Sequence, residues 1–163
     1  MGYSHYWRRE KEIVPVVFQK IVGDFTKLID HMEKVGVKLY GDRAGGEIVL
    51  NENEVRFIGI NKYTAPSRFE PFYFPRVVDE KDGAKPDKSG KCRARCTTGF
   101  EPYDLAAVAF LIIAKHYLKE AIEVKSDGTS DNWFDGKLIC HVTLGYGYEY
   151  NVVDGVLREV DKE

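Results

Sequence analysis

The sequence predicts one α+β domain in which about three helices pack on a mostly antiparallel sheet. Three observations support this class. Apolar residues recur at spacings of three and four over 18–35, the segment 105–114 is apolar on every side, and short strand-like runs are grouped around these helices. A chain of 163 residues without a composition change that would mark a linker fits a single domain over 1–163.

The N-terminal part predicts a strand followed by the longest helix. Aromatic residues favour a strand, and alternation places Tyr3, His5 and Trp7 on one face and the intervening residues on the other. Pro15 suits the first turn of a helix, and Gly36 is a common residue just beyond a helix end. The single apolar stripe between them must pack on another layer, and we expect that layer to be a sheet.

The middle of the chain predicts short strands and a loop. Two apolar runs, 47–50 and 55–60, flank a polar turn at 51–53 and predict a hairpin. The aromatic run 69–74 predicts an edge strand, because prolines interrupt it. Charge, glycine and proline over 79–91 predict a surface loop.

A second helix follows a strand predicted over 92–98. It is predicted over 103–119, with Pro102 before it. Because its middle is apolar all round, we expect this helix to be central and buried. A further strand is predicted over 121–125, with a turn at 126–128.

The last part of the chain predicts a third helix and a hairpin. Ser130 or Asp131 would cap the start of the helix, and Gly145 would follow its last turn. Asp154 and Gly155 favour the tight turn of a hairpin.

Charge and cysteine content limit the classes of partner and the compartment. The 24 Lys and Arg residues are offset by 26 Asp and Glu residues, so duplex DNA or RNA is not an expected partner. Three cysteines, an odd and low number, favour a reducing compartment. The N-terminus has no apolar signal core, and the run 105–114 is too short to cross a bilayer. We therefore expect a cytoplasmic protein without a membrane partner.

Several short motifs are distinctive as a set. They are Gly2 to Trp7 (GYSHYW), Cys96-Thr97 before Pro102-Tyr103-Asp104, Lys115-His116, and Ser126-Asp127-Gly128 followed by Trp133. With these motifs the chain resembles a family of small uncharacterised proteins from bacteria and their phages, over most of its length but weakly over 61–91. The loop 79–95 and the Cys92/Cys96 pair depart from the family pattern. The resemblance implies an intracellular, phage-related setting and no particular reaction.

Aromatic and short polar residues flank the predicted sheet and central helix, and they suggest a binding site for a small ligand. Aromatic rings suit flat ligands, helix N-termini attract anions, and strand ends commonly contact ligands. The residues expected to bind are Tyr3, His5, Trp7, Thr97, Asp104, Ser126, Asp127 and Trp133. The preferred interpretation is a non-enzymatic binding protein for a small, nucleotide-like molecule, which in a phage setting would sequester a host signal. The structural alternatives are core packing, dipole compensation and plain turns.

Two other functions are also compatible with the sequence. His5, His116 and Asp127 have the side-chain types of a metal-assisted or acid–base hydrolase. Alternatively, an exposed aromatic patch at 69–74 would serve a protein-interaction module, with a protein partner or a second copy of the chain.

A metal site has little support from the sequence. Cys92 and Cys96 have a tolerable spacing for zinc, with Cys140 or His141 as further ligands. Adjacent helical residues point about 100° apart, so only one of the latter two would serve, which leaves three ligands at best. We expect no metal and no cofactor.

Overall fold

The computed structural model describes residues 2–59, 69–82 and 85–160. Its strands are β1 (Ser4–Glu10), β2 (Leu39–Tyr40), β3 (Val49–Leu50), β4 (Glu54–Gly59), β5 (Phe72–Pro75), β6 (Lys91–Thr97), β7 (Ile122–Ser126), β8 (Tyr150–Val153) and β9 (Val156–Glu159). Its helices are α1 (Pro15–Lys34), α2 (Asp104–Leu118) and α3 (Phe134–Leu144), with the short 3₁₀ turns η1 (Glu80–Asp82) and η2 (Lys119–Ala121).

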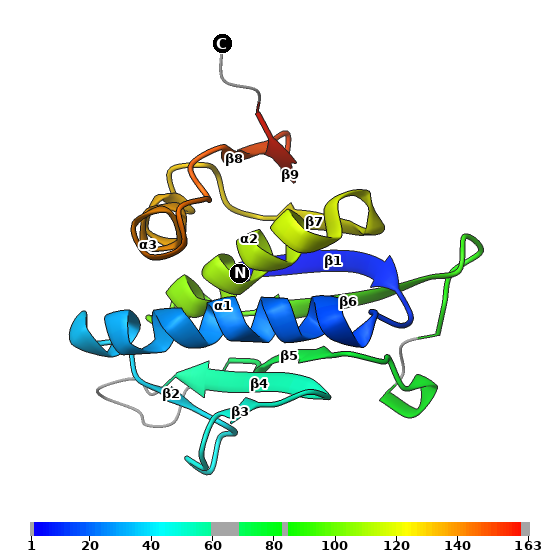
Figure 1. Ribbon diagram of the computed structural model, residues 1–163, viewed down its shortest axis with the longest axis horizontal. Coiled ribbons are helices and arrows are strands. Elements are labelled where there is room, and N and C mark those ends of the chain that lie inside the picture. Colours follow the sequence, from blue (N-terminus) through cyan, green and yellow to red (C-terminus); the bar gives the residue numbers. More distant parts are fainter. Residues whose placement is uncertain (1, 60–68, 83–84, 161–163) are drawn as a thin grey trace.

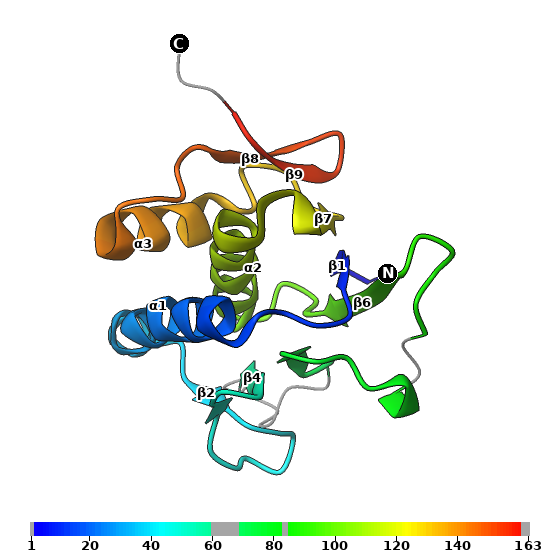
Figure 2. The same ribbon diagram turned by 45° about the vertical axis from the view of Figure 1, so that its right-hand side comes forward.

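The strands form two antiparallel sheets, which confirms the predicted α+β class (Figure 1). The larger sheet has the strand order β6-β1-β7-β9-β8. In the smaller sheet, β4 pairs with β2 and β3, and also with β5. Among the described elements, all three helices lie on one side of strands β6, β1 and β7, whose other side no helix covers (Figure 2). This uncovered side is called the open face below.

Helix α2 is the centre of the fold, as predicted. Residues 106–114 are all buried, which is why this segment is apolar around its whole circumference. Helix α1 packs beside it through the predicted stripe, whose fully buried members are Phe18, Ile21, Phe25, Leu28 and Met32. Burying each of these side chains contributes about 1.5–3 kcal/mol to stability.

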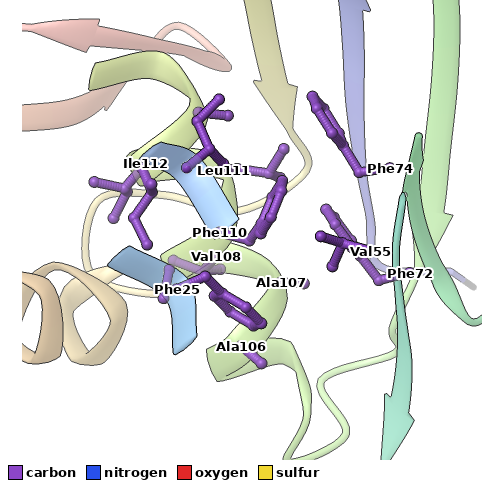
Figure 3. Close-up of a cluster of buried hydrophobic side chains, with 14 of the residues drawn as sticks. Phe25, Val55, Phe72, Phe74, Ala106, Ala107, Val108, Phe110, Leu111 and Ile112 are labelled. Carbon is purple, nitrogen blue, oxygen red and sulfur yellow. The ribbon is translucent and has the colours of Figure 1, made fainter. Parts of the chain in front are cut away.

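Aromatic rings join the two sheets to the helices (Figure 3). Phe25 of α1 stacks on Phe57 of β4 with ring centroids 5.3 Å apart, and Phe57 stacks on Phe72 of β5 at 4.9 Å. Phe110 of α2 meets Phe72 edge-on at 5.1 Å, and Trp7 of β1 lies over the same Phe72 ring at 5.1 Å. One continuous core therefore holds β1 and the smaller sheet against α1 and α2.

Both predicted hairpins are present. Strands β3 and β4 pair across the polar turn, although residue 60 of the predicted strand lies outside the described residues. In the second hairpin Asp154 and Gly155 have φ of 51° and 79°, as a two-residue turn matching the strand twist requires. The predicted loop 79–91 leads into β6 and contains η1, while its positions 83 and 84 are not described.

Two predictions need correction. Helix α3 begins at Phe134 and not at Ser130 or Asp131, because residues 130–133 form turns that bury Trp133 before the helix starts. The predicted exposed patch at 69–74 is wrong, since Phe72 and Phe74 are fully buried between the smaller sheet and α2.

Among the described helices, none is both long and apolar enough to cross a membrane.

Candidate functional site

Polar side chains from five segments meet at one end of the larger sheet. This buried network consists of His5 at the start of β1, Thr98 after β6, Asp104 in the first turn of α2, Ser126 at the end of β7, and Trp133 before α3. His5, Thr98 and Trp133 are fully buried. The antiparallel order β6-β1-β7 brings the ends of β6 and β7 beside the start of β1, so residues far apart in the chain become neighbours.

Hydrogen bonds fix the direction of every proton at Ser126. Its Oγ accepts from the Gly128 backbone N–H at 2.9 Å and from Trp133 Nε1–H at 3.0 Å. Both oxygen lone pairs are then occupied, so the Ser126 proton is donated to His5 Nδ1 at 2.9 Å. His5 is therefore the tautomer protonated on Nε2, which donates to Asp104 Oδ1 at 2.6 Å.

Asp104 is held by further contacts. Thr98 Oγ1 donates to the same Oδ1 at 2.6 Å. A carboxylate in the first turn of α2 also favours the helix dipole. This carboxylate occupies the N-terminal end of α2, where sequence reasoning considered an anion, so the helix end is already compensated by the protein itself.

Tyr3 and Phe100 close the outer end of the network. Their rings stack with centroids 3.5 Å apart, although Phe100 is largely exposed. Phe100 has a φ of 61°, an uncommon conformation for a bulky residue. Burial, with the Asp104 charge as a second cause, raises the pKa of Tyr3 to about 12. Within the described residues, the Tyr3 hydroxyl has no hydrogen-bond partner of normal geometry.

Above the network, a polar rim leads to the open face. Ser4 Oγ and Thr97 Oγ1 lie 2.7 Å apart across β1 and β6. The Asp127 carboxylate is exposed and accepts from the Ser4 backbone N–H at 3.0 Å and from the Tyr6 hydroxyl at 3.5 Å. Asp127 thus offers an anchored acceptor beside the exposed ring of Tyr6.

The open face carries two cross-strand rows of side chains. In the first row Tyr6 lies between Arg95 of β6 and Lys125 of β7, and in the second Arg8 lies between Arg93 and Glu123. Directly opposed residues in antiparallel strands have Cβ atoms about 4.5–5.5 Å apart. An aromatic ring is therefore flanked by two cations on the surface of a chain whose formal net charge is −2.

A depression of about 260 Å³ lies on this face. Its lining includes Tyr6, Arg8, Arg93, Glu123 and Lys125. A second, larger cavity of about 440 Å³ adjoins it, because Arg8 and Glu123 line both. Together they reach the roughly 300–1,000 Å³ that is usual for a small-molecule site.

The arginines of the second row are braced from outside. Arg8 and Arg93 approach Asp87 Oδ2 at 3.5 and 3.6 Å. The Ser89 hydroxyl donates to Asp87, and this bond with the Lys91 and Ser89 backbone N–H groups lowers the Asp87 pKa to about 2. Asp87 is thus an anion at neutral pH that lies close to both guanidinium groups.

The structure brings most of the sequence-predicted site residues together. Tyr3, His5, Asp104, Ser126 and Trp133 form or adjoin the buried network, and Thr97 and Asp127 belong to the rim. Trp7 does not join them, because its ring packs on Phe72 and Phe74 in the core. The rings of Tyr3, Trp7 and Trp133 are buried against other protein groups, so they are not free to stack on a ligand.

His116 lies far from His5 and belongs to a second cluster. It stands twelve residues after Asp104 on α2, which is about 18 Å along a helix. Its ring stacks on Tyr146 at 3.7 Å, and the hydroxyls of Tyr146 and Tyr117 both donate to Asp24 Oδ2, at 2.7 and 2.6 Å. A single centre using His5, His116 and Asp127 is therefore not assembled.

The cysteines do not converge on a metal. Cys92 and Cys96 are four residues apart on β6, which separates their Cα atoms by about 13 Å, too far for a shared zinc ion. Cys140 is buried on α3 against the Ala109 carbonyl. Within residues 2–59, 69–82 and 85–160, no three His, Cys, Asp or Glu side chains are placed to hold a metal ion.

Sequence reasoning missed the residues of the open face. Tyr6, Arg8, Arg93, Arg95 and Lys125 were not among the expected binding residues. The signal was present in the alternation of the strands, since Tyr6 and Arg8 alternate with buried residues on β1, and Arg93 and Arg95 are two residues apart on β6. Alternation along β1 separates this face from the buried one, but only the strand order places the two rows side by side.

Comparison with known protein families, curated proteins and solved structures found no match to this chain. The case for a function therefore depends on the geometry of the chain itself. Two features remain distinct from ordinary packing: the buried network, whose protons are fixed, and the open face above it.

Proposed function

We propose that this protein binds a small nucleotide-like molecule on the open face, with the base on Tyr6 and the phosphate among the surrounding cations. The observation that carries the proposal is the row Arg95–Tyr6–Lys125 on an uncovered sheet, above the Arg93–Arg8 pair. In the phage-related setting that the family resemblance implies, binding would sequester a host signal.

Stacking on Tyr6 supplies the first part of the binding energy. The Tyr6 side chain is 37% exposed and lines the 260 Å³ depression, so a ligand there would contact its ring. Base–aromatic stacking contributes about 1–3 kcal/mol and tolerates any base. The neighbouring Asp127 carboxylate would accept hydrogen bonds from base N–H groups and so select bases that present donors.

The cations supply the second part. Arg95 pairs with Glu70 at 3.6 Å and Lys125 with Glu123 at 3.7 Å, and the side chains of Arg95 and Lys125 are more than half exposed. Exposed ion pairs of this kind contribute at most about 1 kcal/mol, so a phosphate can replace the carboxylates as partner. Arginine suits this role because its planar donors match phosphate oxygens.

The composition of the face favours a small ligand over a nucleic-acid strand. Proteins that bind single strands use several aromatic platforms along a continuous basic groove. The two rows described here present one aromatic ring, Tyr6, and Glu123 and Asp87 interrupt the basic surface. The face therefore has room for one base and its phosphates.

Calorimetric titration with ATP and GTP tests the proposal. Tyr6→Leu should weaken binding by about 5- to 100-fold, the factor that corresponds to one lost stacking interaction. Tyr6→Phe keeps the ring and should lose much less. Lys20→Gln, at an exposed position of α1, is the matched control and should bind like the wild type.

Equal affinity in wild type and Tyr6→Leu, or no heat with any nucleotide at millimolar concentration, would reject the proposal. Circular dichroism of each variant keeps the test interpretable, because Tyr6 is an outward side chain whose loss leaves the core intact.

A serine hydrolase is the second candidate, and one observation favours it. The order Ser126 Oγ–H to His5 Nδ1, then His5 Nε2–H to Asp104, is that of a nucleophile, its base and an orienting carboxylate. However, Ser126 Oγ already accepts two N–H bonds and the residue is only 9% exposed. This set also differs from the predicted His5, His116 and Asp127. Labelling of Ser126 by a fluorophosphonate, detected by mass spectrometry, would establish this candidate, and absence of labelling would dismiss it.

A further inference from the structure

The larger sheet opens between β7 and β9. Within the described residues these strands pair at one position, Lys125 with Val156, beside the backbone bond from Ser126 N–H to the Gly155 carbonyl at 2.9 Å. From there the strands diverge, and the 440 Å³ cavity fills the space between Ile122 and Glu123 on one side and Leu157 and Arg158 on the other. Figure 2 shows the β8–β9 hairpin standing beyond β7. This cavity is called the notch.

Cations converge on the notch from five elements. They are Arg8 of β1, Lys91 at the start of β6, Lys115 and Lys119 at the end of α2 and in η2, and Arg158 of β9. Three carboxylates, Glu120, Glu123 and Glu159, also line it. Two of these are already used, since Glu159 pairs with Lys119 at 3.5 Å and Glu123 with Lys125 at 3.7 Å.

Lys115 does not behave as an ordinary surface lysine. Its Nζ turns inward and donates to the carbonyl oxygens of Ile122 at 2.8 Å and Lys119 at 3.0 Å. Burial lowers its pKa; the charges of Glu120 and Glu123 oppose this shift, and the smaller effects of Arg158 and Lys119 add to it. Lys115 therefore brings a partly buried ammonium group to the wall of the notch.

Arg158 completes the cationic side of the notch. Among the described residues, no carboxylate lies within ion-pair distance of its guanidinium group. An anion in the notch would give Arg158 an ion-pair partner and would lie beside the Lys115 ammonium group.

We infer that the notch binds the polyphosphate of the ligand whose base lies on Tyr6. This inference rests on the proposed function and specifies its substrate class as a nucleoside di- or triphosphate. Arg8 lines both depressions, and it lies two residues from Tyr6 along β1, about 7 Å. A ribose and the first phosphate can bridge this separation, which places the later phosphates between Lys115 and Arg158.

Calorimetry with three probes, adenosine, ATP and inorganic tripolyphosphate, tests the inference. ATP should bind much more tightly than adenosine, and tripolyphosphate should compete with ATP. Arg158→Gln should weaken ATP and tripolyphosphate by about tenfold, the effect of one lost charge-assisted contact, and leave adenosine unchanged. Lys119→Gln is a second variant, and Lys20→Gln on α1 is the control. Lys115→Met is less suitable as the main variant, because Lys115 also caps two backbone carbonyls.

The outcomes separate the inference from the proposed function. Tripolyphosphate binding that Arg158→Gln weakens, without adenosine binding or an effect of Tyr6→Leu, would support the notch and reject the nucleotide proposal. Equal affinities for ATP and adenosine, both sensitive to Tyr6→Leu and insensitive to Arg158→Gln, would overturn the notch alone. Absence of binding by all three probes would overturn both.

Discussion

His5 Nε2 donates to Asp104 Oδ1 across 2.6 Å, and the two residues are 99 positions apart in the chain. This bond joins the start of β1 to the first turn of α2. Ser126 extends the connection to β7, and Trp133 extends it toward α3. The open face lies on the other side of the same strands. The buried network therefore helps to fix the strands that carry the open face.

Ser126→Ala should destabilise the protein by about 2–3 kcal/mol. The substitution leaves the Gly128 N–H, the Trp133 Nε1–H and His5 Nδ1 without their shared partner, and a buried unpaired group costs about 1–3 kcal/mol. Urea denaturation would show a lower midpoint with an unchanged slope. Thr26→Ala, on the exposed side of α1, is the control, with a change of no more than about 0.5 kcal/mol. A midpoint equal to that of the wild type would mean that the network contributes nothing to stability.

Two glycine substitutions should have opposite effects. A Cβ at Gly128 would overlap the hydroxyl oxygen of Tyr3, which stacking on Phe100 keeps in place, so Gly128→Ala should cost about 1–3 kcal/mol. At Gly23 in α1 a Cβ meets no atom within 4 Å, and Gly23→Ala should stabilise the protein by about 0.5–1 kcal/mol. Thermal melting measures both, and a stabilised Gly128→Ala would contradict the packing of Tyr3.

Stability should decrease below neutral pH, in part through His116. Burial, helped by the Lys119 ammonium, lowers the pKa of His116 from 6.5, while Glu149 and Asp24 oppose the shift. The unfolded chain then binds a proton before the folded chain does. The stability associated with neutral His116 is complete above about pH 6.5 and is lost as the pH falls toward the folded-state pKa.

Replacing His116 with Gln should therefore flatten the dependence of the urea midpoint on pH below this value. His31→Gln is the matched control, because it makes the same substitution at an exposed position of α1. The same slope in His116→Gln and wild type would assign the acid sensitivity to other groups.

All three thiols should resist modification in the folded protein. Burial is the main cause that raises the pKa of Cys140 to about 12 and the pKa of Cys96 well above its usual range, and Cys92 is buried too. The thiolate is the reactive form, so a thiol-reactive dye should react slowly in buffer and with all three residues in urea. One fast thiol in native buffer would show that β6 or α3 opens more readily than its packing indicates.

The helices and their burial could be predicted from sequence because they depend on local periodicity. The stripe of α1 and the all-apolar middle of α2 each define how many faces of the helix must be covered. The hairpin at Asp154 and Gly155 was equally predictable, since few residues adopt positive φ readily. The start of α3 was not, because packing of Trp133 in the core decides where the helix begins.

The sequence by itself determined the α+β class, the central place of α2 and the polar motifs at the strand ends, since propensity, period and turn chemistry act between near neighbours. Only the tertiary structure decided which motifs meet. It joined His5 to Asp104 and Ser126, placed His116 elsewhere, and set Tyr6 between Arg95 and Lys125. Strand order and register are set by packing of the whole core, which no short stretch of sequence contains.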